Sequence, residues 1–206
     1  MITKKKKDIY HLTPITRRVL ADLETPLSIY IKLAKEKNSF LLESIEGGEK
    51  WGRYSIIGLP TSKSIVVKGH EVRVFENEIL IERVVSRDPL NFIQEYQEQF
   101  IIEGASQLPR FSGGLVGYFG FDVVRYAEPK LENSYPTDSL DTPDIYLLLV
   151  DSFIIFDALK GVLILVKYVE KDNAAQISAG QHFLAELEKR LSSIPVSRAK
   201  STSAKF

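Results

Sequence analysis

Short apolar runs separated by tight-turn signals follow one another along this chain, and this pattern constrains the fold most strongly. Strand-like runs occupy residues 39–45, 54–59, 78–85, 145–156 and 162–169, and residues 64–75 read as a hairpin that turns at Gly69 and His70. Most consecutive runs are joined by turns too short to hold a crossover helix, so neighbouring strands must pair antiparallel. Strand runs also outnumber helices. The sequence therefore predicts an α+β fold: antiparallel β-sheets with a few packed helices, not regular βαβ alternation.

Three helices are expected between and after these strands. Thr25-Pro26 and Asp88-Pro89 each place a capping side chain before a proline that suits the first turn of a helix. Apolar residues at helical spacing continue from the first signal to residue 34 and from the second to Phe100. A third helical pattern covers residues 173–191.

Composition and charge exclude several classes of function. The chain has 206 residues, of which 44% are hydrophobic, enough for one large domain or two small ones. Its 27 basic and 27 acidic residues balance, whereas nucleic-acid-binding proteins usually have a strong basic excess. The longest apolar run, residues 145–150, is far shorter than the roughly 20 residues of a membrane helix. We therefore expect no nucleic acid, no membrane and a cytoplasmic location.

Composition also divides the chain. Residues 1–8 are basic and are expected to form a mobile N-terminus, and residues 9–194 to form one domain. Residues 195–206 (PVSRAKSTSAKF) carry three positive charges, no acidic residue and few apolar ones. Such a segment cannot bury enough surface to order itself, so it is expected to be a linker toward a further part.

Residues suited to catalysis are scarce. The chain has no cysteine, which excludes disulfides, thiolate metal sites and a cysteine nucleophile. The three histidines, His11, His70 and His182, have no metal-ligating neighbours at useful spacing. No G-x-S-x-G or Walker motif is present. We therefore expect no catalytic residue, no metal ligand and no cofactor in this chain.

One segment carries the polar groups of an amino-acid pocket. Residues 40–59 read FLLESIEGGEKWGRYSIIGL, in which Glu43 and Ser44 interrupt an apolar strand. Glu43 can accept a ligand ammonium, whereas Leu42 and Ser44 would share the other face of the strand. Arg53, next to Tyr54, could bind a ligand carboxylate or form an ion pair with Glu43. The alternative is a surface hairpin with a salt bridge and no ligand.

A second segment is rich in glycine. Residues 109–129 read PRFSGGLVGYFGFDVVRYAEP, with four glycines within eight residues. They could cradle a phosphate, but the spacing is not G-x-G-x-x-G and bulky aromatic residues follow. A strand packed closely on another element is the favoured interpretation. Asp122, Arg125 and Glu128 then follow at helical spacing, suited to i, i+3 ion pairs on an exposed face.

The two segments resemble the N-terminal region of the anthranilate synthase component I family, and the resemblance extends over residues 9–194. The stretches that carry it are LLESIEGGEKWGRYSIIG and FSGGLVGYFGFDVVRYAEP. This family opens tryptophan biosynthesis by converting chorismate and glutamine-derived ammonia to anthranilate and pyruvate. Phe121 departs slightly, because the family often has tyrosine there. The resemblance implies that this region holds much of a feedback site for L-tryptophan. Its implied contacts are Leu42, Glu43 and Ser44, then the less securely aligned Arg53 and Tyr54, with a supporting motif of Gly113, Gly114, Gly117, Tyr118 and Asp122.

The same resemblance places the chemistry elsewhere. The family's chorismate pocket, its Mg²⁺-binding glutamates and its catalytic His and Lys lie in a C-terminal part whose motifs do not occur in this chain. The chain alone is thus expected to be inactive. Its expected partners are that C-terminal catalytic part and a glutamine amidotransferase subunit. The alternatives are the N-terminal part of aminodeoxychorismate synthase, a subunit-interaction module without a ligand, and a chain that performs the lyase chemistry itself.

Overall fold

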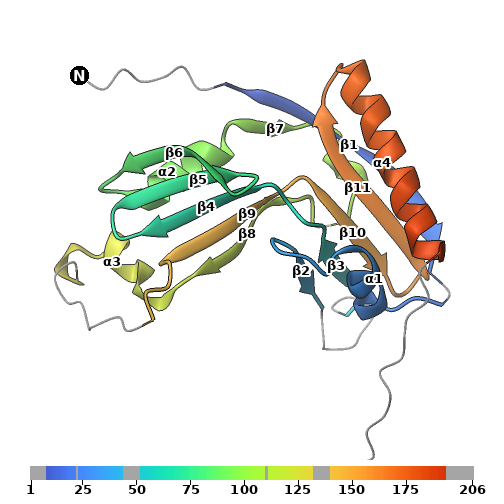
Figure 1. The fold of residues 1–206 in the computed structure, drawn as a ribbon, viewed down its shortest axis with the longest axis horizontal. Coiled ribbons are helices and arrows are strands. Elements are labelled where there is room, and N and C mark those ends of the chain that lie inside the picture. The colour runs from blue at the N-terminus through green and yellow to red at the C-terminus, as the bar shows by residue number, and fades with distance from the viewer. Residues whose placement is uncertain (1–7, 22, 44–51, 110, 132–139, 194–206) are drawn as a thin grey trace, which may run out of the picture.

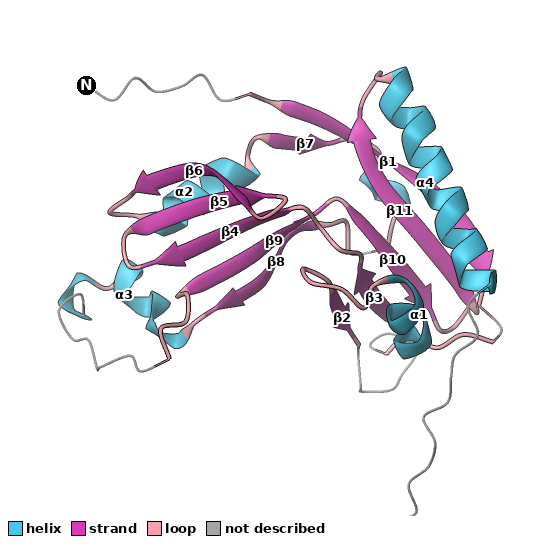
Figure 2. Ribbon diagram, in the orientation of Figure 1, coloured by secondary structure: helices cyan, strands magenta, loops and turns pink. Residues whose placement is uncertain are grey.

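Two mostly antiparallel sheets with helices on their outer faces make up the chain in a computed structural model (Figures 1 and 2). The structure describes residues 8–21, 23–43, 52–109, 111–131 and 140–193. This architecture confirms the predicted α+β class. The expected mobile N-terminus and C-terminal linker lie outside the described residues, apart from Asp8.

The first sheet has six strands in the order β2-β3-β10-β11-β1-β7. All neighbours in it are antiparallel except β1 and β7, which are parallel. In chain order its strands are β1 (Tyr10–Leu20), β2 (Phe40–Leu42), β3 (Tyr54–Gly58), β7 (Phe100–Ile102), β10 (Ser152–Asp157) and β11 (Val162–Glu170).

The second sheet has five antiparallel strands in the order β6-β5-β4-β9-β8. Its strands are β4 (Lys63–Lys68), β5 (Glu71–Glu76), β6 (Ile79–Val85), β8 (Gly114–Phe119) and β9 (Ile145–Val150). The chain leaves this sheet at Val150 and enters the first sheet at Ser152, so the two sheets meet where β9 runs into β10 (Figure 1).

Three apolar clusters form the core. Side chains of both sheets pack together around Phe153, which is fully buried. On its other face the first sheet is covered by α1 (Pro26–Leu33) and α4 (Ala174–Ser193). The second sheet is covered by α2 (Pro89–Gln97). The sheet-to-sheet cluster holds the two sequence motifs, as described below.

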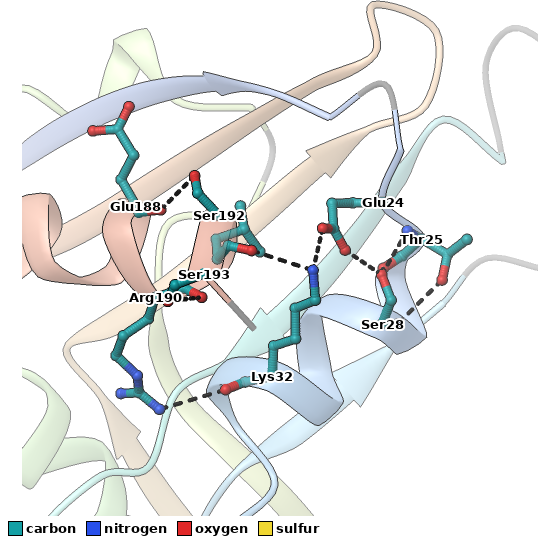
Figure 3. Close-up of polar contacts among 9 residues, drawn as sticks. Glu24, Thr25, Ser28, Lys32, Glu188, Arg190, Ser192 and Ser193 are labelled. Carbon is teal, nitrogen blue, oxygen red and sulfur yellow. Dashed lines mark hydrogen bonds and ion pairs between the residues drawn. The ribbon is translucent and has the colours of Figure 1, made fainter. Parts of the chain in front are cut away.

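The helices begin where the capping signals predict. Thr25 and Ser28 form a capping box at the start of α1, and the Asp88 carboxylate accepts from the Asn91 amide at the start of α2. Figure 3 shows how α1 is tied to α4: buried Lys32 pairs with Glu24 and donates to the Leu191 carbonyl at 3.2 Å. A short helix, α3 (Val124–Ala127), follows β8.

Two sequence predictions about elements are wrong, and one strand was missed. Residues 145–156 form two strands in different sheets, because the chain changes sheets at Asp151. Phe100, expected in a helix, lies in β7, where it pairs with Tyr10 and stacks on its ring. The longest strand, β1, was not predicted at all. The hairpin of residues 64–75 and its turn at Gly69 and His70 are confirmed.

Candidate ligand-binding site

The edge of the first sheet carries the start of the first motif. In β2, Phe40 pairs with Gly58 and Leu42 with Ile56, so these four residues share one face. The Phe40 ring lies over Gly58 so closely that an added Cβ there would be 2.0 Å from the ring. Leu42 ends the strand with 47% of its surface exposed, next to exposed Glu43. An apolar side chain and a carboxylate are thus both open at this edge.

Aromatic contacts join this edge to the glycine-rich segment. The Phe40 ring meets the ring of Phe111 edge-on at 6.5 Å, and Phe111 packs against Phe153 at 5.1 Å. Just before β2, the Asn38 side chain accepts a hydrogen bond from the Tyr146 hydroxyl at 2.8 Å. Tyr146 in turn stacks on Tyr118 of β8 at 6.4 Å. Two motifs some 70 residues apart therefore meet at the junction of the two sheets.

The glycines allow β8 to approach its neighbours. A Cβ on Gly117 would lie 1.9 Å from the Tyr146 carbonyl oxygen, and one on Gly113 would lie 3.0 Å from that of Val150. Gly113 and Gly114 also adopt positive φ, at 83° and 108°, which side chains disfavour. Since β8 pairs along its length with β9, this segment is a closely packed strand and not a phosphate-binding loop.

The end of the glycine motif is held by an ion pair. Asp122 accepts from Arg125 at 2.6 Å, which confirms the predicted i, i+3 pair. The Arg125 side chain is only 10% exposed, so the expectation of a fully exposed face is wrong. Tyr118 is 46% exposed, and its hydroxyl donates to the Pro143 carbonyl. Asp122 thus has a local structural partner, whereas Tyr118 presents ring surface at the sheet edge.

Arg53 makes a bidentate ion pair with Asp157 of β10. Its Nε and Nη2 donate to the two carboxylate oxygens at 2.8 and 2.6 Å, and its guanidinium lies 4.8 Å from the Tyr54 ring centre. Of the two alternatives raised for Arg53, the ion pair with Glu43 is therefore not formed, because the guanidinium pairs with Asp157. Asp157 is 5% exposed, and its pKa is lowered chiefly by the Arg53 hydrogen bond, while the same bond raises the pKa of Arg53.

The structure places three of the predicted contacts together: Leu42, Glu43 and Tyr54 lie at the same end of the β2–β3 pair. Tyr118 lies in the second sheet, and its stacking partner Tyr146 reaches Asn38, at the opposite end of β2. Ser44 lies outside the described residues. Sequence reasoning did not single out Phe40 and Phe111. Their signal was an aromatic residue at the start of each motif, at FLLES and at FSGG.

Comparison with known proteins points to one enzyme. The chain is 45% identical over 184 residues to anthranilate synthase component 1 of Pseudomonas aeruginosa, covering 89% of this chain and 37% of that protein. It is 40% identical over 191 residues to the Acinetobacter calcoaceticus protein of the same name, covering 91% and 38%. The chain is homologous to anthranilate synthase component 1. No protein-family model matches it.

A solved structure of similar name also matches. It is anthranilate synthase component I from Streptococcus pneumoniae, at 26% identity and a TM-score of 0.48, covering 87% of this chain and 37% of that one. The identity to the curated relatives confirms the family resemblance inferred from the motifs. The chain spans little more than a third of the length of the curated relatives it matches.

Among the residues that the structure describes, no group of three or more His, Asp or Glu side chains is placed to hold a metal ion. None of the described helices is long and apolar enough to cross a membrane.

Proposed function

We propose that this chain is the tryptophan-sensing part of an anthranilate synthase component I. The observation that carries the proposal is the meeting of the two motifs through Phe40 and Phe111 beside exposed Leu42 and Glu43. The names of the homologues support the enzyme assignment. Tryptophan is the ligand that the motif resemblance implies.

The exposed groups have the chemistry of an amino-acid site. The Glu43 carboxylate can accept the ligand ammonium in a charge-assisted hydrogen bond. Leu42 and the exposed ring of Tyr118 offer apolar surface for an indole. Arg53 is already paired with Asp157, so it holds the start of β3 rather than serving as a free carboxylate receptor.

In the complete enzyme, the binding would lower activity. Inhibition requires that tryptophan bind one conformation more tightly than another. A ligand that bridges this chain and the catalytic part would resist movement between them. In this proposal the complete assembly converts chorismate and ammonia to anthranilate and pyruvate. The Mg²⁺ and the glutamine amidotransferase subunit also belong to that assembly. No described residue of this chain is assigned a chemical step.

The test is a calorimetric titration of the chain with L-tryptophan. L-Phenylalanine, which has a different aromatic side chain, is the control ligand. Replacing Glu43 by Gln removes the charge-assisted hydrogen bond, worth about 1.5–3 kcal/mol, so affinity should fall at least about tenfold. Glu36→Gln is the matched control, because Glu36 is equally exposed and lies before β2. If the chain alone binds too weakly, the same variants in the complete enzyme should show loss of feedback inhibition for Glu43→Gln only. Unchanged inhibition in both variants would refute the assignment of Glu43.

One observation favours a second function, subunit interaction. Strand β6 is an edge of the second sheet, and Ile79, Ile81 and Val85 on it are 67%, 52% and 78% exposed. Exposed apolar edge strands are prone to pair with another chain. Co-elution of the pure chain with a glutamine amidotransferase subunit on a sizing column, abolished by Ile81→Lys, would establish this role. Separate elution would exclude it for this subunit.

A further inference from the structure

A pocket that neither Leu42 nor Glu43 lines opens on the first sheet. It has a volume of about 300 Å³ and lies over the ends of β3, β10 and β11, beneath the segment of Gln107 to Pro109. Tyr54, Asp157 and Val162 lie opposite one another on neighbouring strands and form one cross-strand row. Ile164 and Arg18 are partners in the next row on the same face. The same face of the sheet therefore supplies the floor and one rim of the pocket.

The charges around this pocket do not balance. Among the described residues that line it, Arg53, Arg18 and Lys160 are cationic and Asp157 is the one carboxylate. Asp157 is fully engaged: both oxygens accept from Arg53, and one also accepts from the Lys160 backbone amide at 3.2 Å. Neither the Arg18 side chain nor that of Lys160 forms an ion pair with any other residue that the structure describes. Two positive charges remain at the rim.

About half of the pocket lining is apolar. Leu108, Pro109, Val162 and Ile164 line it, together with the half-buried ring of Tyr54. A volume of this size suits a small ligand. Cations at the rim attract an anion. A free guanidinium is also well shaped for bidentate binding of carboxylate or phosphate.

We propose that this pocket binds a small organic dianion, a dicarboxylate or a phosphate monoester, between Arg18 and Lys160. The two free cations match the two charges of the ligand, and its short carbon body lies against Val162 and Ile164. The Arg53–Asp157 pair fixes the intervening wall. This site goes beyond the tryptophan-sensing role: Arg53 and Tyr54, which the motif resemblance also implies as tryptophan contacts, form part of its wall, whereas neither Leu42 nor Glu43 lines it.

The test is an NMR titration of the labelled chain with two probes, inorganic phosphate and succinate, at constant ionic strength set by chloride. Shifts are expected at Tyr54, Lys160 and Val162 with millimolar or tighter affinity. The double variant Arg18→Gln/Lys160→Gln should weaken binding at least tenfold. Both replaced side chains are exposed, so the fold should be retained, as checked by the unchanged remainder of the spectrum. Arg87→Gln is the control, an exposed cation that does not line the pocket.

Each outcome decides the proposal. Tighter binding of phosphate indicates a phosphoryl ligand, and tighter binding of succinate a dicarboxylate; either supports the site. Absence of shifts with both probes overturns it. Equal weakening by Arg87→Gln and by the double variant also overturns it, because general charge screening would then explain the binding. Glu43→Gln should leave phosphate and succinate binding unchanged, which separates this proposal from the tryptophan site.

Discussion

The buried carboxylate of Asp157 should make a measurable contribution to stability, and Asp157→Asn removes its charge with little change in shape. The side chain is 5% exposed and accepts three hydrogen bonds, two of them from the Arg53 guanidinium. Asparagine keeps one acceptor oxygen but turns an amide NH₂ toward Arg53. At least one charge-assisted bond is lost, which costs about 1.5–3 kcal/mol. Because Arg53 is 24% exposed and water can reach it, we expect a loss near the lower end, about 2 kcal/mol.

The destabilisation should depend on pH in a defined direction. Hydrogen bonding by Arg53 lowers the pKa of Asp157 in the folded protein below its value of about 4 in the unfolded chain. The charged pair therefore stabilises the fold fully above that unfolded value, and this contribution is lost as the pH falls through the folded-state pKa. Asparagine does not titrate. The difference in unfolding free energy between wild type and variant should thus shrink as the solution is acidified.

Urea unfolding at a series of pH values measures both quantities. With a slope of about 2 kcal/mol per molar urea, the neutral-pH midpoint of Asp157→Asn should fall by about 1 M. Asp151→Asn is the matched control: Asp151 pairs with Lys167 at 2.7 Å but is 46% exposed, so its loss should cost less than about 1 kcal/mol. Equal effects of the two variants, or a difference that does not shrink in acid, would refute the argument.

Two further predictions follow from packing and burial. Gly117→Ala should destabilise the fold by at least about 2 kcal/mol, since its Cβ would lie 1.9 Å from the Tyr146 carbonyl oxygen. Gly69→Ala, with positive φ but open space, should cost only about 1 kcal/mol, and thermal melts compare the two. Burial raises the pKa of Tyr96 and Tyr168 to about 12, so ultraviolet titration should show two tyrosines ionising there. Tyr168→Phe should remove one of these, and stability should fall as the pH rises above about 10; a titration unchanged by Tyr168→Phe would contradict the assignment.

The sequence predicted correctly those elements that are defined by turn or capping residues within the element itself. The hairpin of residues 64–75 has a glycine turn with alternating valines, and α1 and α2 begin at a capping residue followed by proline. Strand β1 has no such signal, because Pro14 and the pair Arg17–Arg18 interrupt its apolar pattern. It is a strand because it pairs over nine positions with β11, about 150 residues later in the chain.

For the candidate site too, the sequence could predict the residues but not the contacts that arrange them. The motif residues Leu42, Glu43, Tyr54 and Tyr118 could be selected from sequence, and each has exposed or half-exposed surface near the sheet junction. Their arrangement depends on distant contacts. Phe40 meets Phe111 only because both sheets fold, and Arg53 pairs with Asp157, 104 residues away. No spacing rule within a motif predicts either contact.

Nuclear Overhauser contacts from the indole ring of added L-tryptophan to the chain test the central claim most directly. A labelled sample would distinguish the Leu42 methyl groups from every other leucine. We expect contacts from the indole protons to Leu42 and to the Tyr118 ring, and no intermolecular contacts to these two residues when L-phenylalanine is added in place of L-tryptophan. In the complete enzyme the same contacts should persist. Indole contacts confined to other residues, with Leu42 and Tyr118 unaffected in both samples, would contradict the account.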